Sequence, residues 1–193
     1  MPRETRQCLR NYCTTHRTPP TDTAMSFEIS EACPSSAAFF GFMGVTAAVA
    51  FCNLGSAYGT AKSGVGLSSM GVIHADRVMR NVIPVIMAGI LSIYGLIVGA
   101  ILVGRITPPD ASGNKYSAYD GYAHLAAGLT CGLASLASGL AIGVAGDAGV
   151  RAAGQQPKLF VALMLMMIFS EALGLFGMIV ALMLALKTSG DIC

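Results

Sequence analysis

Residues 159–186 read LFVALMLMMIFSEALGLFGMIVALMLAL, a run of 28 residues whose one charged side chain is Glu171. Because about 20 apolar residues rising about 1.5 Å each span a hydrocarbon core of about 30 Å, this run is long enough to cross a bilayer as a helix. Three further windows contain no charged residue at all; they cover residues 32–61, 81–104 and 121–146. The sequence therefore predicts an all-α membrane protein with four transmembrane helices.

The composition of the whole chain agrees with this fold class. The chain has 193 residues, of which 54% are hydrophobic and 11% charged, against about 25% charged in a typical soluble domain. Its formal net charge of +2 provides no basic field for nucleic acid. No arrangement of nucleophile, acid and base is visible, so the sequence excludes an ordinary soluble enzyme and predicts no nucleic-acid partner.

The second half of the chain repeats the first. At an offset of 84, glycines of the first window align with glycines of the third; the pairs are Gly44 with Gly128, Gly55 with Gly139, and Gly59 with Gly143. At an offset of 82, the second window aligns with the fourth, so that Gly89 matches Glu171 and Tyr94 matches Phe176. The sequence therefore predicts two tandem helical hairpins that run in the same sense through the membrane.

The same windows predict the domain organisation. The first hairpin is expected over residues 25–104, with spans at about 35–60 and 72–104. A connection follows over 105–120, and the second hairpin covers 121–193, with spans at about 121–146 and 159–186. Residues 1–24 are rich in Arg, Thr and Pro and are expected to be a disordered extension. Cys8, Cys13 and His16 in this extension lack the four-ligand spacing of a structural zinc site.

Basic residues in the connections predict the orientation. The connections at residues 62–80 and 147–158 hold five of them, Lys62, Arg77, Arg80, Arg151 and Lys158. The middle connection holds two, Arg105 and Lys115. The positive-inside rule therefore places the first two connections in the cytoplasm, and the middle connection and both termini in the lumen. The arginines at positions 3, 6, 10 and 17 argue for the opposite orientation, although most lie far from the first span.

Glycines form a stripe on the first and third windows. The members are Gly41, Gly44, Gly55 and Gly59 on the first and Gly128, Gly132, Gly139, Gly143 and Gly146 on the third. Small residues in a membrane let two helix backbones approach closely and gain dispersion contacts. Two such stripes on alternate helices of a duplicated hairpin favour a ring whose inner wall is made of the first and third helices. Local pairing of two helices is the alternative.

Glu171 is the candidate functional residue. It lies 12 residues after Leu159 and 15 before Leu186, which are about 18 and 22 Å along a helix, so it is expected near the bilayer midplane. An acidic side chain there costs about 2.5 to 3.5 kcal/mol to insert. Because desolvation disfavours the charged form, Glu171 can cross an apolar layer as a neutral acid and ionise where water or a cation stabilises the anion. The sequence therefore predicts a proton carrier.

Few polar side chains accompany this carboxyl group. Ser92, Tyr94 and Ser170 are the candidate neighbours, and the sequence leaves open whether Ser92 or Tyr94 donates a hydrogen bond to it. A sodium site would need several oxygen ligands around the carboxylate, and all the glutamines lie outside the spans. We therefore expect H⁺ to be the transported ion, with no resident metal or cofactor. A carboxyl group that only holds helices together is the structural alternative.

Other residues are expected to be structural. Cys52 and Cys131 fall inside apolar windows and are predicted to be small packing residues. His74 and His124 lie near the ends of the spans, where a wetted surface position is expected. Pro84, early in the second span, is expected to kink or loosen that helix.

Several runs of this sequence closely resemble the ring-forming proteolipid, the c-subunit, of vacuolar-type proton ATPases. They are LGSAYGTAKSGVG at 54–66, NVIPVIMAGI at 81–90, AIGVAGDAGVR at 141–151, QQP at 155–157 and the apolar segment around Glu171. The resemblance covers about residues 25–193. It implies that the chain is one protomer of a rotor ring, that Glu171 is the essential proton-carrying carboxylate, and that Gly89 marks a copy without a carboxylate.

The resemblance also implies the partners and the location. The ring would contain copies of this chain, with or without paralogous proteolipids, and would turn in the lipid bilayer against the stationary a-subunit. ATP hydrolysis would lie on a separate soluble sector, linked through a central stalk at the cytoplasmic connections, in a vacuolar or other acidic endomembrane compartment. A secondary proton-coupled transporter or a purely structural ring would need no ATP-driven rotation, so an inhibitor of the soluble sector would discriminate between them and the pump.

Overall fold

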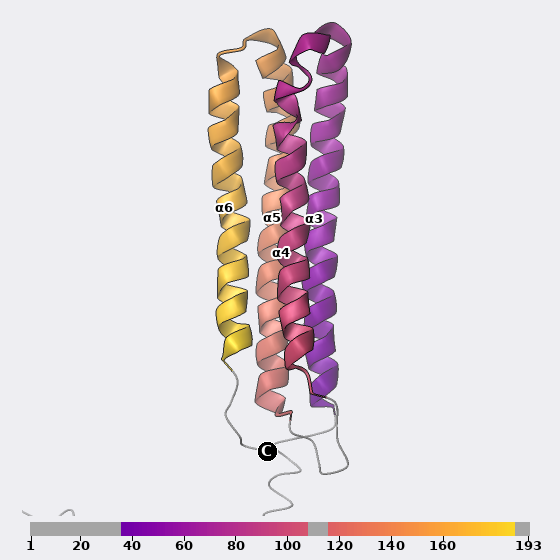
Figure 1. Cartoon of the computed structure of the whole chain (residues 1–193), viewed down its shortest axis with the longest axis vertical. Coiled ribbons are helices and arrows are strands. Elements are labelled where there is room, and N and C mark those ends of the chain that lie inside the picture. The colour runs from indigo at the N-terminus through magenta and orange to yellow at the C-terminus, as the bar shows by residue number, and fades with distance from the viewer. Residues whose placement is uncertain (1–35, 108–115, 188–193) are drawn as a thin grey trace, which may run out of the picture.

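The computed structural model describes residues 36–107 and 116–187, which form a bundle of four long helices (Figure 1). The helices are α3 (Ala37–Ile73), α4 (Ile83–Arg105), α5 (Ala118–Gln155) and α6 (Leu159–Leu186). Two short 3₁₀ turns, η1 (Ala75–Arg77) and η2 (Arg80–Val82), connect α3 to α4. The predicted extension at 1–24, with Cys8, Cys13 and His16, and residues 108–115 of the middle connection lie outside the described residues.

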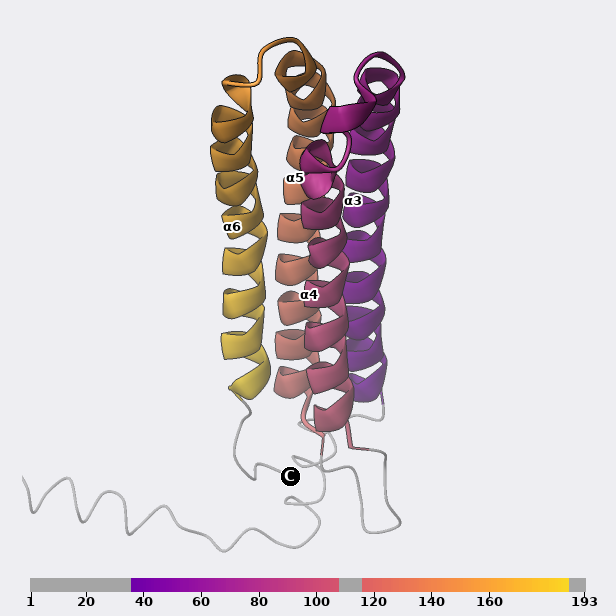
Figure 2. The same ribbon diagram turned by 45° about the horizontal axis from the view of Figure 1, so that its top comes forward.

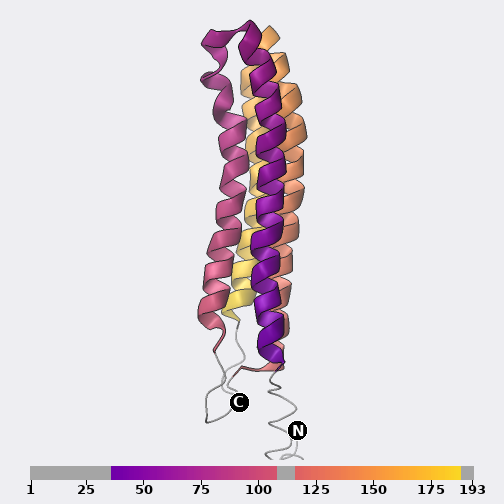
Figure 3. The ribbon, with the colours of Figure 1, turned by 90° about the vertical axis from the view of Figure 1, so that its right-hand side faces the viewer.

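The chain folds as two tandem hairpins. The turns α3–α4 and α5–α6 lie at one end of the bundle, while the start of α3 and the end of α6 lie at the opposite end (Figures 1 and 2). The most extensive contact joins α3 to α5, the two first helices of the hairpins. α4 packs mainly on α3, and α6 packs mainly on α5, so that both lie on the same side of the α3–α5 pair (Figure 3). The parallel duplication predicted from the sequence is therefore confirmed in the arrangement of the helices.

All four helices are long and apolar enough to cross a membrane. Large apolar side chains also cover their outer faces; on α6, for example, Val161, Phe169 and Met183 are 66 to 73% exposed. Exposed apolar side chains on this scale need lipid or another protein surface around them. The buried interior consists mainly of small and aliphatic residues, among them Ala48, Cys52, Val98, Cys131 and Ala181.

Two helices extend beyond the expected spans. α3 continues to Ile73 and α5 to Gln155, so residues 62–73 and 147–155, expected as connections, are helical. Charged residues mark where the hydrocarbon ends, whereas a helix ends where its packing ends. Here the packing continues, because Gly66 lies against Asp147 and Gly154 against Met70. The membrane boundaries themselves stay a prediction.

α4 begins later than the expected second span. Residues 75–82 form the turns η1 and η2, and the helix starts at Ile83 instead of near residue 72. Pro84 lies in its first turn, so the expected loosening within the span is wrong. A first-turn proline removes no intrahelical hydrogen bond, since the N–H at that position has no partner in any helix.

A polar cluster closes the opposite end of the bundle. The Ser117 side chain caps α5 by accepting a hydrogen bond from the Asp120 N–H at 3.1 Å. The Tyr116 hydroxyl bonds His124 Nδ1 at 2.5 Å, and burial, followed by the nearby Asp120 charge, raises the pKa of Tyr116 to about 12. His124 is only 1% exposed, so the expected wetted position is wrong for it. The His74 side chain, by contrast, is exposed, as expected for a surface position.

Candidate functional site

Glu171 lies near the middle of α6, between the two hairpins. Its side chain is partly buried, and its Oε1 accepts a hydrogen bond from the Tyr94 hydroxyl of α4 at 3.3 Å. The carboxyl group therefore comes from the second hairpin and its hydroxyl partner from the first. The aromatic ring of Tyr94 can pack among apolar neighbours while its hydroxyl reaches a polar partner.

The structure discriminates between the two candidate donors. The Ser92 hydroxyl donates to the Gly89 carbonyl of its own helix at 2.8 Å, instead of to Glu171. A serine inside a helix commonly bonds a carbonyl one turn earlier, which satisfies its hydroxyl without another helix. Tyr94 is therefore the neighbour that reaches the carboxyl group.

Ser170 has a different partner from the one the sequence suggests. Its backbone carbonyl accepts a hydrogen bond from the Ser138 hydroxyl of α5 at 2.6 Å, and its own hydroxyl donates to the Ser138 carbonyl at 3.4 Å. This reciprocal pair joins α5 to α6 directly beside Glu171. Ser138 is not among the neighbours expected from the sequence, although a serine in the middle of a charge-free window is a signal for an interhelical hydrogen bond.

A glycine one turn along α6 lets three helices converge at the site. A Cβ added at Gly174 would lie 2.9 Å from Leu91 Cδ2 of α4 and 3.4 Å from Ser138 Oγ of α5. The role of Gly174 is not readable from the sequence, because it depends on which helices face this glycine. The convergence holds the Ser138 pair and the Tyr94 hydroxyl on the same level as Glu171.

The electrostatic surroundings of Glu171 are weak. Within residues 36–107 and 116–187, one ion pair has a nitrogen–oxygen distance below 4.0 Å; it joins Asp147 to Arg151 and does not involve Glu171. In the same ranges no group of three or more His, Cys, Asp or Glu side chains could hold a metal ion. Within the described residues, the Glu171 carboxyl group therefore has one hydroxyl donor, Tyr94, and no cation at ion-pair distance.

The repeat-related position in the first hairpin is open. A Cβ added at Gly89 would meet no atom within 4 Å. Crowding at the Cβ position therefore does not account for the glycine in the first copy.

The glycine stripes of α3 and α5 face each other in register. A Cβ at Gly128 would collide with the Gly44 carbonyl, and one at Gly139 would collide with the Gly55 carbonyl. Farther along, a Cβ at Gly143 would lie 3.2 Å from the Gly59 Cα. Residues that are equivalent in the repeat therefore pair directly across the contact of the two helices.

The other stripe glycines accommodate different neighbours. Gly41 lies under the Tyr116 hydroxyl, Gly132 under the Ala47 carbonyl and Phe51, and Gly146 against Ser63. Cys52 and Cys131 are fully buried near the same contact, with their sulfur atoms 3.9 Å apart. The structure thus places the stripe glycines other than Gly41 at the α3–α5 contact of a single chain, whereas Gly41 faces Tyr116 and Ile106. The place of the stripes in a ring wall stays a prediction.

Comparisons with known proteins agree with the duplicated architecture. A family model for the ATP synthase C-subunit matches residues 43–102 and 125–184, one segment in each hairpin.

Full-length relatives give a finer assignment. The V-type proton ATPase 16 kDa proteolipid subunit of Chrysotila carterae is 59% identical over 159 residues, which cover 82% of this chain and 97% of the relative. The corresponding 16 kDa proteolipids of Ascaris suum and Caenorhabditis elegans, both named as c-subunits, are each 56% identical over 161 residues, covering 83% of this chain and 98% of each relative. The chain therefore belongs to the ATP synthase C-subunit family and, within it, to the proteolipid subunits of V-type proton ATPases.

Proposed function

We propose that Glu171 is the residue through which this V-type ATPase proteolipid transports protons. The subunit itself is an integral, multi-pass membrane protein of the membrane sector, forms a ring with copies of itself, and leaves ATP hydrolysis to other subunits. The assignment to Glu171 rests on one observation: a partly buried carboxyl group in the middle of an apolar helix accepts a hydrogen bond from a tyrosine hydroxyl, and none of the described cations pairs with it.

This geometry suits reversible protonation. In lipid the neutral acid is the stable form, because transferring an unpaired carboxylate into hydrocarbon is costly. The Tyr94 hydroxyl, 3.3 Å from Oε1, can donate to either form, since the carboxyl oxygen accepts in both. Glu171 can therefore take a proton where water reaches it, cross the lipid face as a neutral acid, and release the proton where a positive charge stabilises the anion.

The stationary a-subunit is the partner we assign to the release step. An arginine of that protein would stabilise the Glu171 anion and so drive proton release, after which the group would take up a new proton as the ring turns. ATP hydrolysis in the soluble sector drives the rotation, and each full turn of the ring then moves one proton per protomer past this contact.

The orientation and location follow from the charge distribution. Five of the seven basic residues in the three predicted connections, among them Arg77, Arg80 and Lys158, lie in the connections at 62–80 and 147–158, which favours the cytoplasm for that end and the lumen for both termini. The central-stalk subunits would then dock at these connections, and paralogous proteolipids could share the ring. A vacuolar or other acidic endomembrane compartment is the location we propose.

The test is ATP-driven acidification of vesicles whose rings carry Glu171→Gln. Acidification is expected to fall to background while ring assembly stays intact, because glutamine keeps the size and polarity of the side chain but cannot ionise. Asp76→Asn is the matched control, since it makes the same chemical change in η1, away from the bilayer centre, and is expected to acidify normally.

A second variant separates transport from assembly. Glu171→Asp keeps an ionisable group and is expected to retain part of the acidification. Wild-type acidification by Glu171→Gln rings would sink the proposal and require a different proton path.

A further inference from the structure

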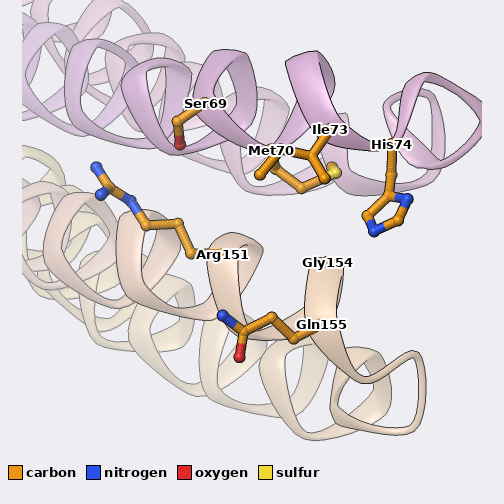
Figure 4. Close-up of a pocket in the computed structure, with 7 residues that line it drawn as sticks. All are labelled: Ser69, Met70, Ile73, His74, Arg151, Gly154 and Gln155. Carbon is orange, nitrogen blue, oxygen red and sulfur yellow. The ribbon is translucent and has the colours of Figure 1, made fainter.

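A groove with both polar and apolar lining residues lies between the ends of α3 and α5, away from Glu171. Its volume is about 290 Å³, and it is lined by Ser69, Met70, Ile73 and His74 from α3 and its C-cap and by Arg151, Gly154 and Gln155 from α5. Figure 4 shows the Arg151 guanidinium and Ser69 at one end of the groove and His74 at the other, with the Gln155 amide on the α5 side between them. None of these residues contacts Glu171 or its hydrogen-bond partner Tyr94 in the structure.

The charges around the groove favour an anion. Arg151 Nε donates to Asp147 Oδ1 at 2.8 Å, which engages one of the five N–H donors of the guanidinium. Arg77 does not line the groove, but its Nη1 donates to the carbonyl of the lining residue Gly154 at 2.8 Å, so a second guanidinium lies next to a lining residue. In the described residues, Asp147 is the one carboxylate that bonds either guanidinium. The two arginines and Asp147 together therefore carry a net positive charge.

The groove is expected to lie at the same distance from the bilayer midplane as the lipid headgroups. Ser138 is level with Glu171, because it bonds Ser170. Arg151 and Gln155 follow Ser138 by 13 and 17 residues, or about 20 and 25 Å along α5. With Glu171 near the midplane, the hydrocarbon core ends about 15 Å away and the headgroup layer about 20 to 22 Å away. The groove therefore lies within and just above the headgroup layer.

An apolar strip continues from the groove toward the bilayer centre. Val144 on α5 is one heptad before Arg151 and thus on the same helix face, and it is 62% exposed. Val65 and Tyr58, on the α3 face of Ser69, are 55% and 38% exposed. Tyr58 also borders the α3–α5 contact, because a Cβ at Gly143 would lie 3.2 Å from its Cδ1.

We propose that this groove binds the phosphate headgroup of an anionic phospholipid, with Arg151 as the main ligand and the acyl chains lying along the strip of Tyr58, Val65 and Val144. A guanidinium forms short, charge-assisted hydrogen bonds with phosphate oxygens, and the Gln155 amide adds a neutral donor, whereas the Ser69 hydroxyl donates to the Gly66 carbonyl of its own helix at 2.9 Å. A free phosphate ion shares the headgroup chemistry but would not use the apolar strip. The inference rests on the insertion of the chain in a membrane and on the depth of Glu171, but not on proton transport.

The experiment uses rings of the full chain in nanodiscs of phosphatidylcholine that contain a small fraction of spin-labelled phosphatidic acid. The immobilised fraction of the label gives the preference for phosphatidic acid over labelled phosphatidylcholine. Arg151→Gln is expected to lower this preference about fivefold to tenfold, because one charge-assisted contact is lost. Arg80→Gln is the matched control; it removes the same charge at the same end of the bundle but outside the groove, and less than about a twofold change is expected.

Two further arms keep the proposal falsifiable. Asp147→Asn frees the Arg151 guanidinium and is expected to preserve or raise the preference, which a merely structural role of the ion pair would not do. Excess inorganic phosphate is expected to leave the labelled lipid in place. Equal losses in Arg151→Gln and Arg80→Gln, no loss in either, or displacement by inorganic phosphate would each overturn the lipid site. None of these measurements depends on acidification, so the proton-carrying role of Glu171 is tested separately.

Discussion

The two hairpins have the same helical plan but differ at the level of the bilayer centre. In the second hairpin, Ser138 bonds Ser170 across α5 and α6, and Glu171 follows directly. With the repeat offsets of 84 and 82, the first hairpin has Leu54, Ala88 and Gly89 in these three places. One copy thus holds all the polar groups of these three positions, and the other copy is apolar there.

This difference shows what a bilayer demands of a polar residue. The second hairpin must satisfy its hydroxyl and carboxyl groups inside protein, because lipid offers no hydrogen-bond partner. It does so with a partner from the other copy, since Tyr94 of α4 bonds Glu171 of α6. The candidate site around Glu171 therefore draws on both hairpins, although the sequence repeat divides the chain between them.

The glycine contact of α3 and α5 is the feature that the two hairpins share, and it has the largest expected effect. Gly128→Val should prevent correct assembly, at a cost of about 3 kcal/mol, because its Cβ would collide with the Gly44 carbonyl. The yield of intact rings in mild detergent, together with their resistance to protease, measures this effect.

Two variants complete that experiment. Gly44→Val should cause a comparable loss, since its Cβ would meet the backbone of His124 and Leu125. Gly89→Ala, where an added Cβ meets no atom of the chain within 4 Å, should assemble normally. Wild-type yields from Gly128→Val would refute the in-register contact of the two copies.

Removing the hydroxyl that links the hairpins at the site should have an intermediate effect. Tyr94→Phe is expected to slow ATP-driven acidification about threefold to tenfold, because the Glu171 carboxyl loses the donor at 3.3 Å. The initial acidification rate, measured over a range of external pH at constant ring content, tests this role. Ser92→Ala should match the wild type, since the Ser92 hydroxyl bonds its own helix. Equal slowing in both variants would contradict the assignment to Tyr94.

The serine pair of the second hairpin has the smallest expected effect. Ser138→Ala should lower the stability of the folded protein by about 1 kcal/mol, which is the scale of an interhelical hydrogen bond in a membrane. Ser63→Ala is the matched control, because this buried serine donates to the Gly59 carbonyl of its own helix at 2.6 Å and should cost less. Detergent denaturation followed by circular dichroism measures both. A larger loss in Ser63→Ala would show that the hydroxyl pair does not distinguish the second hairpin.

The sequence by itself determined the number of membrane helices, their duplication and the unique position of Glu171. These features are readable because a hydrocarbon solvent imposes a minimum apolar length and makes every charge within that length exceptional. The family follows from the same segments, since the two matched regions fall one in each hairpin.

Only the tertiary structure decided which side chains meet. Ser92 and Tyr94 are two residues apart, and the rotation of α4 against α6 determines that the tyrosine reaches the carboxyl group. The burial of His124 and the ends of α3 and α5 likewise depend on what packs against them, which charge patterns along a chain do not specify. Composition and spacing determine where a helix can lie in a membrane, whereas its neighbours and its rotation depend on close packing among residues distant in sequence.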